Sequence, residues 1–126
     1  MSQDAGVLDL TFKAGEALTN YQYHFVKLDG TSGIVHCSAA KELSIGILQN
    51  APADKRAARI RLLGTSKLVM GATCNEMALI TPTDDGHGAV AIADKDHVGA
   101  IALEAAGAID EIIEVLITKL HLKVGA

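Results

Sequence analysis

Short apolar stretches that alternate with polar residues recur along this chain, and glycine-containing turns separate them. Residues 44–50 form an apolar stretch with a glycine inside it, and residues 59–64 alternate and then end at a glycine. Alternation with a period of two is typical of strands with one buried face. A glycine inside a strand marks a bulge or a close approach of two backbones. The pattern predicts many short strands.

The same arrangement returns in the second half of the chain, in the same order. The corresponding stretches are 25–30 and 79–86, 44–50 and 98–103, and 59–64 and 112–118, with Gly46 aligned to Gly99. Self-similarity of this kind indicates a repeated structural unit. We therefore predict two diverged β modules, an internal pseudo-repeat of residues 21–68 and 74–121.

Length and composition place these modules in one domain. The chain has 126 residues, of which 49% are hydrophobic and only 3% aromatic, so the core should be aliphatic. A chain of this length buries about two-thirds of its unfolded surface and needs no disulfide or metal to fold. We expect a mainly β fold, a compact β-barrel or β-tulip-like single domain with little helix.

Residues 107–121 carry two conflicting patterns. Apolar residues from Ile109 to Leu120 have the spacing of an amphipathic helix. Ile113, Val115 and Ile117 also alternate, and β-branched residues favour strands. The repeat decides in favour of a strand, because this segment corresponds to the alternating stretch 59–64.

The N-terminal region begins with small and polar residues. Residues 1–6 are expected to be disordered in the free protein. Leu8, Leu10 and Phe12 then alternate with polar residues, as in a half-buried strand. We predict a flexible N-terminal arm over residues 1–12 and the single β domain over residues 13–126.

Three of the four aromatic residues, Tyr21, Tyr23 and Phe25, alternate within a predicted strand over residues 21–28 and so share one face. They form either part of the core of the first module or an exposed anchor for a partner, because tyrosine is enriched at interface hot spots. His24 among them is interpreted as a hydrogen-bonded structural residue.

Charge and cysteine content exclude several classes of protein. The formal net charge is −4 and basic residues form no long run, whereas nucleic-acid-binding domains are usually basic on one face. No apolar stretch reaches the length of a membrane span, and the first residues do not resemble a signal peptide. Cys37 and Cys74 lack metal-ligand spacing, so we predict two free, buried thiols in a reducing compartment; a disulfide between them is the alternative that the sequence leaves open.

Known catalytic and ligand-binding motifs are missing from the sequence. The cluster Asp94-Lys95-Asp96-His97 lacks the glycine and closing glutamate of a calcium loop and is interpreted as a solvated turn. We predict no catalytic residue, no cofactor and no metal. The competing hypothesis is a ligand-binding protein or small enzyme whose subunit-boundary pocket is lined by His24, His36 or His97.

Four motifs together resemble those of the tailed-bacteriophage and prophage head decoration, or capsid cement, proteins. They are Ser44-Ile45-Gly46-Ile47-Leu48-Gln49-Asn50-Ala51-Pro52, Arg59-Ile60-Arg61-Leu62-Leu63-Gly64-Thr65-Ser66-Lys67, Val98-Gly99-Ala100-Ile101-Ala102-Leu103-Glu104-Ala105 and Glu111-Ile112-Ile113-Glu114-Val115-Leu116-Ile117. The resemblance covers most of residues 21–118. The loop at Asp54-Lys55-Arg56 lacks a glycine frequent in that family, and the chain extends beyond the family's usual end.

This resemblance implies a non-enzymatic structural protein of the virion. Such a protein is assembled in the bacterial host cytoplasm, binds the major capsid protein on the outer surface of the expanded head, often as a homotrimer, and stabilises the head against internal pressure. The alternative within the same class is another structural subunit of the virion. The residues expected to contact the capsid or a second copy are Leu8, Leu10, Phe12, Tyr21 and Tyr23.

Overall fold

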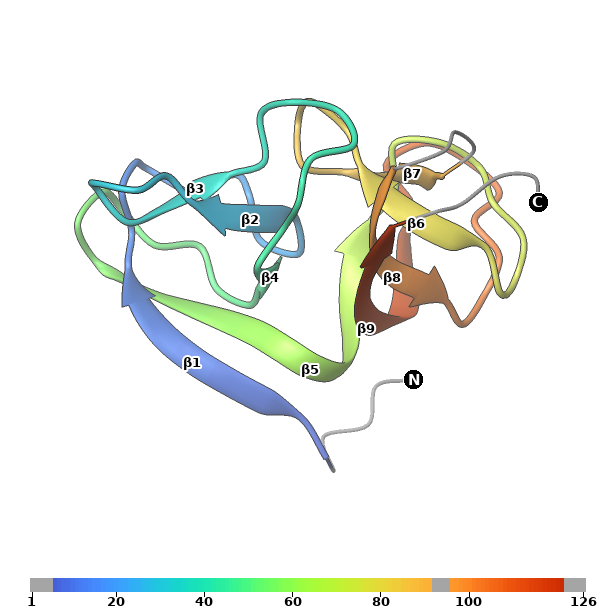
Figure 1. Cartoon of the computed structure of the whole chain (residues 1–126), viewed down its shortest axis with the longest axis horizontal. Coiled ribbons are helices and arrows are strands. Elements are labelled where there is room, and N and C mark those ends of the chain that lie inside the picture. The colour runs from blue at the N-terminus through green and yellow to red at the C-terminus, as the bar shows by residue number, and fades with distance from the viewer. Residues whose placement is uncertain (1–5, 92–95, 122–126) are drawn as a thin grey trace.

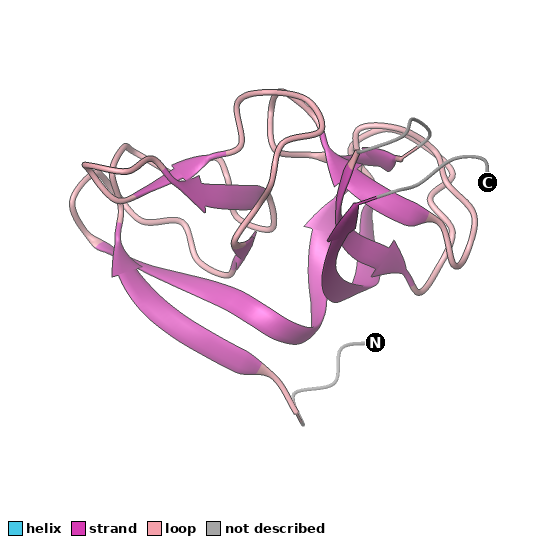
Figure 2. Ribbon diagram, viewed as in Figure 1, coloured by secondary structure: helices cyan, strands magenta, loops and turns pink. Residues whose placement is uncertain are grey.

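The structure, a computed structural model, describes residues 6–91 and 96–121, and this part of the chain contains strands and loops but no helix (Figures 1 and 2). The strands are β1 (Leu8–Lys13), β2 (Phe25–Leu28), β3 (Ile34–His36), β4 (Gly46–Leu48), β5 (Ala57–Val69), β6 (Leu79–Pro82), β7 (Gly88–Val90), β8 (His97–Ala102) and β9 (Ile112–His121).

All named strand pairs are antiparallel and join one curled sheet, in the order β3-β2-β4-β5-β9-β8-β6-β7, with β1 also paired to β5. The sheet forms a half-barrel. Figure 1 shows β1 to β4 gathered at one end of the long strand β5 and β6 to β9 at the other. The prediction of a mainly β, single-domain fold with little helix is confirmed.

We call β1 to β4 with the β1-paired part of β5 the first half of the sheet, and the β9-paired part of β5 with β6 to β9 the second half. Strand pairing repeats between these two halves. Phe25 pairs with Ile47 as Leu79 pairs with Ile101. Leu48 pairs with Ile60 as Ala102 pairs with Val115. The N-terminal part of β5 pairs with β1, and the C-terminal part of β5 pairs with β9 in the equivalent register. Strand β5 is therefore the last strand of the first half of the fold and the first strand of the second half. Its C-terminal part is the equivalent of β1.

The sheet register differs by one residue from the alignment of the two glycines. Gly46 pairs with Val26, and the residue in the same position of the second half, opposite Ile80, is Ala100. Gly99 lies at the irregularity between Val98 and Ala100 in the β8–β9 pair. A bulge adds one residue to one strand, so the alignment by glycine was wrong by that residue.

Each half encloses its own aliphatic core. The first core consists of Ala14, Leu18, Val26, Ile34, Leu48, Ala58 and Ile60. The second consists of Leu68, Met70, Cys74, Ile80, Ala100, Ala102, Ala106, Ile113, Val115 and Ile117, together with Phe25, Cys37 and Ile47 from the first half. Because neighbouring strand residues point to opposite faces, Val26 fills one core and Phe25 the other.

Phe25 joins the two halves through both its ring and its backbone. Its ring lies so close to Gly99 that a Cβ there would come within 2.6 Å of the ring atom Cε1. Its backbone N–H donates to the carbonyl of Gly86 (2.7 Å), and Lys41 N–H donates to the carbonyl of Pro82 (2.8 Å). The halves are therefore packed against each other and joined by backbone hydrogen bonds.

Two predicted segments can be compared directly with the strands. The strand predicted within residues 107–121 is confirmed as β9, and its helical alternative is wrong. The strand predicted over residues 21–28 begins only at Phe25, because residues 21–24 form a turn. Tyr23 has a positive φ of 65°, and its N–H donates to the carbonyl of Leu48. Tyr21, Tyr23 and Phe25 therefore do not share one strand face.

Candidate functional site

Strand β1 presents exposed apolar side chains at the rim of the sheet. Leu8 is 43% and Leu10 is 45% exposed, and Leu8 pairs with Leu63, which is 55% exposed. Phe12 instead packs against the first core. Among the described strands β1 pairs only with β5. Residues 8–12 of the predicted arm thus lie in an edge strand, while residues 1–5 are outside the described residues.

An ion pair fixes the outer face of β1. Arg61 Nε donates to Asp9 Oδ1 (2.8 Å) and Nη2 donates to Oδ2 (3.1 Å), while Arg59 lies 3.7 Å away. The hydrogen bond from Arg61 is the main reason that the pKa of Asp9 is lowered. The pair holds β1 against β5 although the strand lies at the edge.

The two tyrosines of the predicted contact set lie in different surroundings. The Tyr21 ring stacks on His36, with 4.2 Å between ring centroids, and packs against the first core. Tyr23 lies beneath Lys67, whose Nζ is 5.7 Å from the ring centroid. Tyr21 and Tyr23 thus have different neighbours, and a contact surface that includes all five residues stays a prediction.

Histidines from both halves meet beside Tyr21. The rings of His24 and His87 are 4.6 Å apart, and Tyr21 contacts both His24 and His36. His36 Nδ1 is 2.6 Å from Glu16 Oε2, and His24 Nδ1 bonds the carbonyl of Gln22 (3.0 Å). Burial is the main cause of the lowered pKa of His24. These rings pack on one another, as expected of a structural cluster, and His97 lies on β8.

The described residues offer little reactive chemistry. Over residues 6–91 and 96–121 no three His, Cys, Asp or Glu side chains are placed to hold a metal ion. Cys37 and Cys74 are free and buried, as predicted, and burial raises the pKa of Cys37 to about 12. A thiol of this kind is not a nucleophile at neutral pH. Residues 94 and 95 of the acidic cluster fall outside the described residues.

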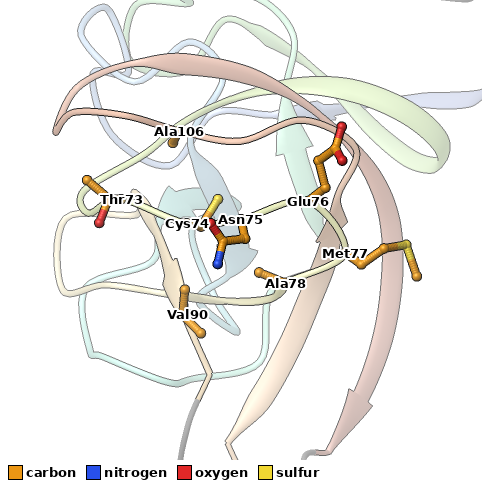
Figure 3. A pocket seen from close by; sticks show the side chains of 8 residues that line it. All are labelled: Thr73, Cys74, Asn75, Glu76, Met77, Ala78, Val90 and Ala106. Atoms are coloured by element: carbon orange, nitrogen blue, oxygen red, sulfur yellow. The ribbon is translucent and has the colours of Figure 1, made fainter.

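A hollow of about 450 Å³ opens between loops of the second half (Figure 3). Its lining residues are Thr73, Cys74, Asn75, Glu76, Met77, Ala78, Val90 and Ala106. Figure 3 shows that the Met77 side chain points away from the loops. Glu76 is the one charged residue among the described residues that line it.

A second hollow is a predominantly apolar groove of about 370 Å³ between the first half and β9. Leu28, Leu43, Ser44 and Ile45 line it, together with Lys27 and with Lys119 of β9. Leu28 is 48% and Leu43 is 57% exposed. These leucines were not predicted from the sequence as contact residues, although Leu28, the apolar residue that ends β2 beside a turn, was a usable signal.

Comparison with solved structures gives a match over nearly the whole chain. The fold resembles the head fiber gp8.5 N base of bacteriophage phi29, with a TM-score of 0.68. The match covers 93% of this chain and 98% of that chain at 14% sequence identity. No protein-family model and no curated protein matches the sequence. The likeness at this identity is one of fold.

Among the described residues no helix is long and apolar enough to cross a membrane.

Proposed function

We propose that this chain is a bacteriophage head decoration protein, which binds the major capsid protein on the outer surface of the expanded head. The observation that carries the proposal is the shared fold, along nearly the full length of both chains, with the base of a bacteriophage head fiber. The motifs that resemble those of capsid decoration proteins point independently to the same particle. The role is structural and non-enzymatic, and the protein resides on the virion as a homotrimer.

Edge strand β1 is the proposed capsid contact. Leu8 and Leu10 are exposed there, and an edge strand has backbone groups that can pair with a strand of another protein. An acidic protein on the outer surface has no need to contact DNA. Many copies, each binding only the expanded shell, would stabilise that shell by linkage.

Co-sedimentation of the purified protein with expanded capsids lacking it tests this proposal, with unexpanded capsids as the control. Saturable binding to expanded capsids alone is the expected result. Binding to neither form would overturn the decoration role, while equal binding to both would remove its proposed dependence on expansion.

Substitution is a sharper test of the contact than deletion of residues 1–12, because Phe12 belongs to the packed first half. The Leu8→Asp/Leu10→Asp double variant should lose capsid affinity about 100-fold or more, since each buried leucine contributes about 1.5–3 kcal/mol. Ile109→Asp is the matched control, because Ile109 is 67% exposed and lies in the loop between β8 and β9. Unchanged binding of the double variant would exclude β1 as the contact.

A further inference from the structure

The second half of the fold carries an apolar row on the sheet face that points away from its own core. Pairing between strands places Leu79 beside Ile101, and Ile101 beside Leu116. Their chain neighbours Ile80 and Val115 point to the opposite face and fill the second core. Leu116 is 39% exposed, and Leu79 and Ile101 are partly exposed. This apolar row therefore faces outward.

The equivalent row in the first half is covered. Phe25 pairs with Ile47, and Ile47 pairs with Arg61, in the register of Leu79, Ile101 and Leu116. Phe25 and Ile47 are fully buried because the second half of the chain packs over them. The apolar row of the second half is thus a face of the same kind, and within residues 6–91 and 96–121 it is left partly exposed.

The residues of the second half that cover the apolar row of the first half can also be named. Pro82 accepts a hydrogen bond from Lys41, His97 N–H lies 3.4 Å from the carbonyl of Lys41, and Gly99 lies against the ring of Phe25. At the same offset along the chain, the first half has Leu28, Leu43 and Ile45 in place of these three residues. These residues line the apolar groove and are exposed or partly exposed.

Side-chain sizes at the two positions compensate. Within the chain, the large ring of Phe25 faces Gly99, where even a Cβ would collide with it. Between the two uncovered surfaces, Leu79 would face Ile45. Leu79 is smaller than its equivalent Phe25, and Ile45 is larger than its equivalent Gly99. Apolar surfaces of complementary shape are what a stable contact requires.

We propose that copies of this chain associate head to tail, with the apolar groove of one copy (Leu28, Leu43, Ile45) covering the apolar row of the next (Leu79, Ile101, Leu116). Such a contact uses two different surfaces, so it repeats from copy to copy until a ring closes. Three copies would give a ring of six modules. The proposal rests on the self-association in the proposed function and is independent of capsid binding.

Analytical ultracentrifugation of the free protein tests the contact without any capsid. The wild type should sediment as a trimer of the 13.1 kDa chain. Leu43→Asp blocks the groove and Leu116→Asp blocks the row, and both side chains are already exposed, so each variant should fold and sediment as a monomer. Met77→Asp is the matched control, since Met77 is 71% exposed outside both surfaces, and should remain a trimer.

An equimolar mixture of Leu43→Asp and Leu116→Asp gives the decisive result. Each variant keeps the surface that the other has lost, so the mixture should form a heterodimer with one intact contact and then stop. A monomeric wild type, an oligomer that survives either substitution, or a mixture that remains monomeric would each overturn the proposal. Capsid binding by a monomeric wild type would separate this failure from failure of the decoration role.

Discussion

The two halves of the sheet share a register but fill it with different side chains. Ala14 bridges Ile34 in the first half, and Met70 bridges Gly88 at the equivalent positions in the second. A Cβ on Gly88 would lie 2.7 Å from Met70 Sδ. A small and a large residue have thus exchanged places within one pair. Backbone pairing has been kept while core volume has been redistributed, consistent with cores that tolerate exchange when total volume is conserved.

A second difference concerns the outer faces, and it separates structural from interaction residues. Phe25 and Leu79 occupy equivalent positions, yet Phe25 is fully buried and Leu79 is partly exposed. Phe25 therefore joins the two halves within one chain, whereas the equivalent Leu79 is exposed enough to contact a second copy.

The largest effect is expected from truncation at these two equivalent positions. Phe25→Ala should lower the free energy of unfolding by about 3–5 kcal/mol, because it leaves a cavity between the halves. Leu79→Ala should cost only about 1 kcal/mol, since a partly exposed residue loses less contact. Urea denaturation in the monomeric Leu43→Asp background measures both. Equal losses would contradict the difference in burial between the halves.

An intermediate effect is expected when the core pair of the first half is transferred to the second. Gly88→Ile should destabilise by about 1–3 kcal/mol through overpacking, because a Cβ there would lie within 2.8 Å of atoms of Met70, Ile80 and Leu68. Adding Met70→Ala recreates the Ala14–Ile34 combination and should restore part of this loss, since the contacts with Ile80 and Leu68 remain. A double-mutant cycle by urea denaturation measures the coupling. If the losses in free energy of unfolding of the two single variants simply add, Gly88 and Met70 do not compensate for each other in volume.

The smallest effect concerns the ion pair that only the first half has, because Thr65 and Leu116 replace Asp9 and Arg61 in the second. The folded-state pKa of Asp9 is lowered, so its stabilisation is present above the unfolded pKa near 3.8 and is lost as pH falls through the folded value. Asp9→Asn should cost less than about 1 kcal/mol at neutral pH.

Thermal unfolding between about pH 5 and pH 2 measures this dependence. Asp9→Asn should flatten the acid loss of stability relative to wild type, whereas Asp54→Asn, at an exposed carboxyl, should follow the wild type. An unchanged acid profile in Asp9→Asn would show that the pair with Arg61 adds nothing to folding.

Alternation and repetition predicted most of the sheet, because half-buried strands impose a period of two on their residues. Residues 112–121 carry both helical and strand spacing, and comparison with the first half favoured the strand that forms. For residues 21–24 the same pattern predicted a strand where the structure has a turn. Tyr21 and Tyr23 alternate like strand residues, but the positive φ of Tyr23 depends on hydrogen bonds to Leu48 and Val69, which are distant in sequence.

The interaction surfaces were harder to predict because exposure depends on what the other half covers. In β8, Val98, Ala100 and Ile101 make both faces apolar, and this is the signal that would have identified an outer apolar face. Nothing local distinguishes Ile101 from its equivalent Ile47, which is buried only because a second module follows it.

Strand β5 has a consequence for the tolerance of this chain to insertions. Its 13 residues close one module and open the next, and they turn at Gly64, where φ is +97°. Boundaries between modules are usually loops, where added residues do little harm. Here an added residue would slip the register and turn the inward side chains of one module outward. Strand β5, where the two modules join, should therefore tolerate insertions and deletions least, and changes in length should be confined to the turns.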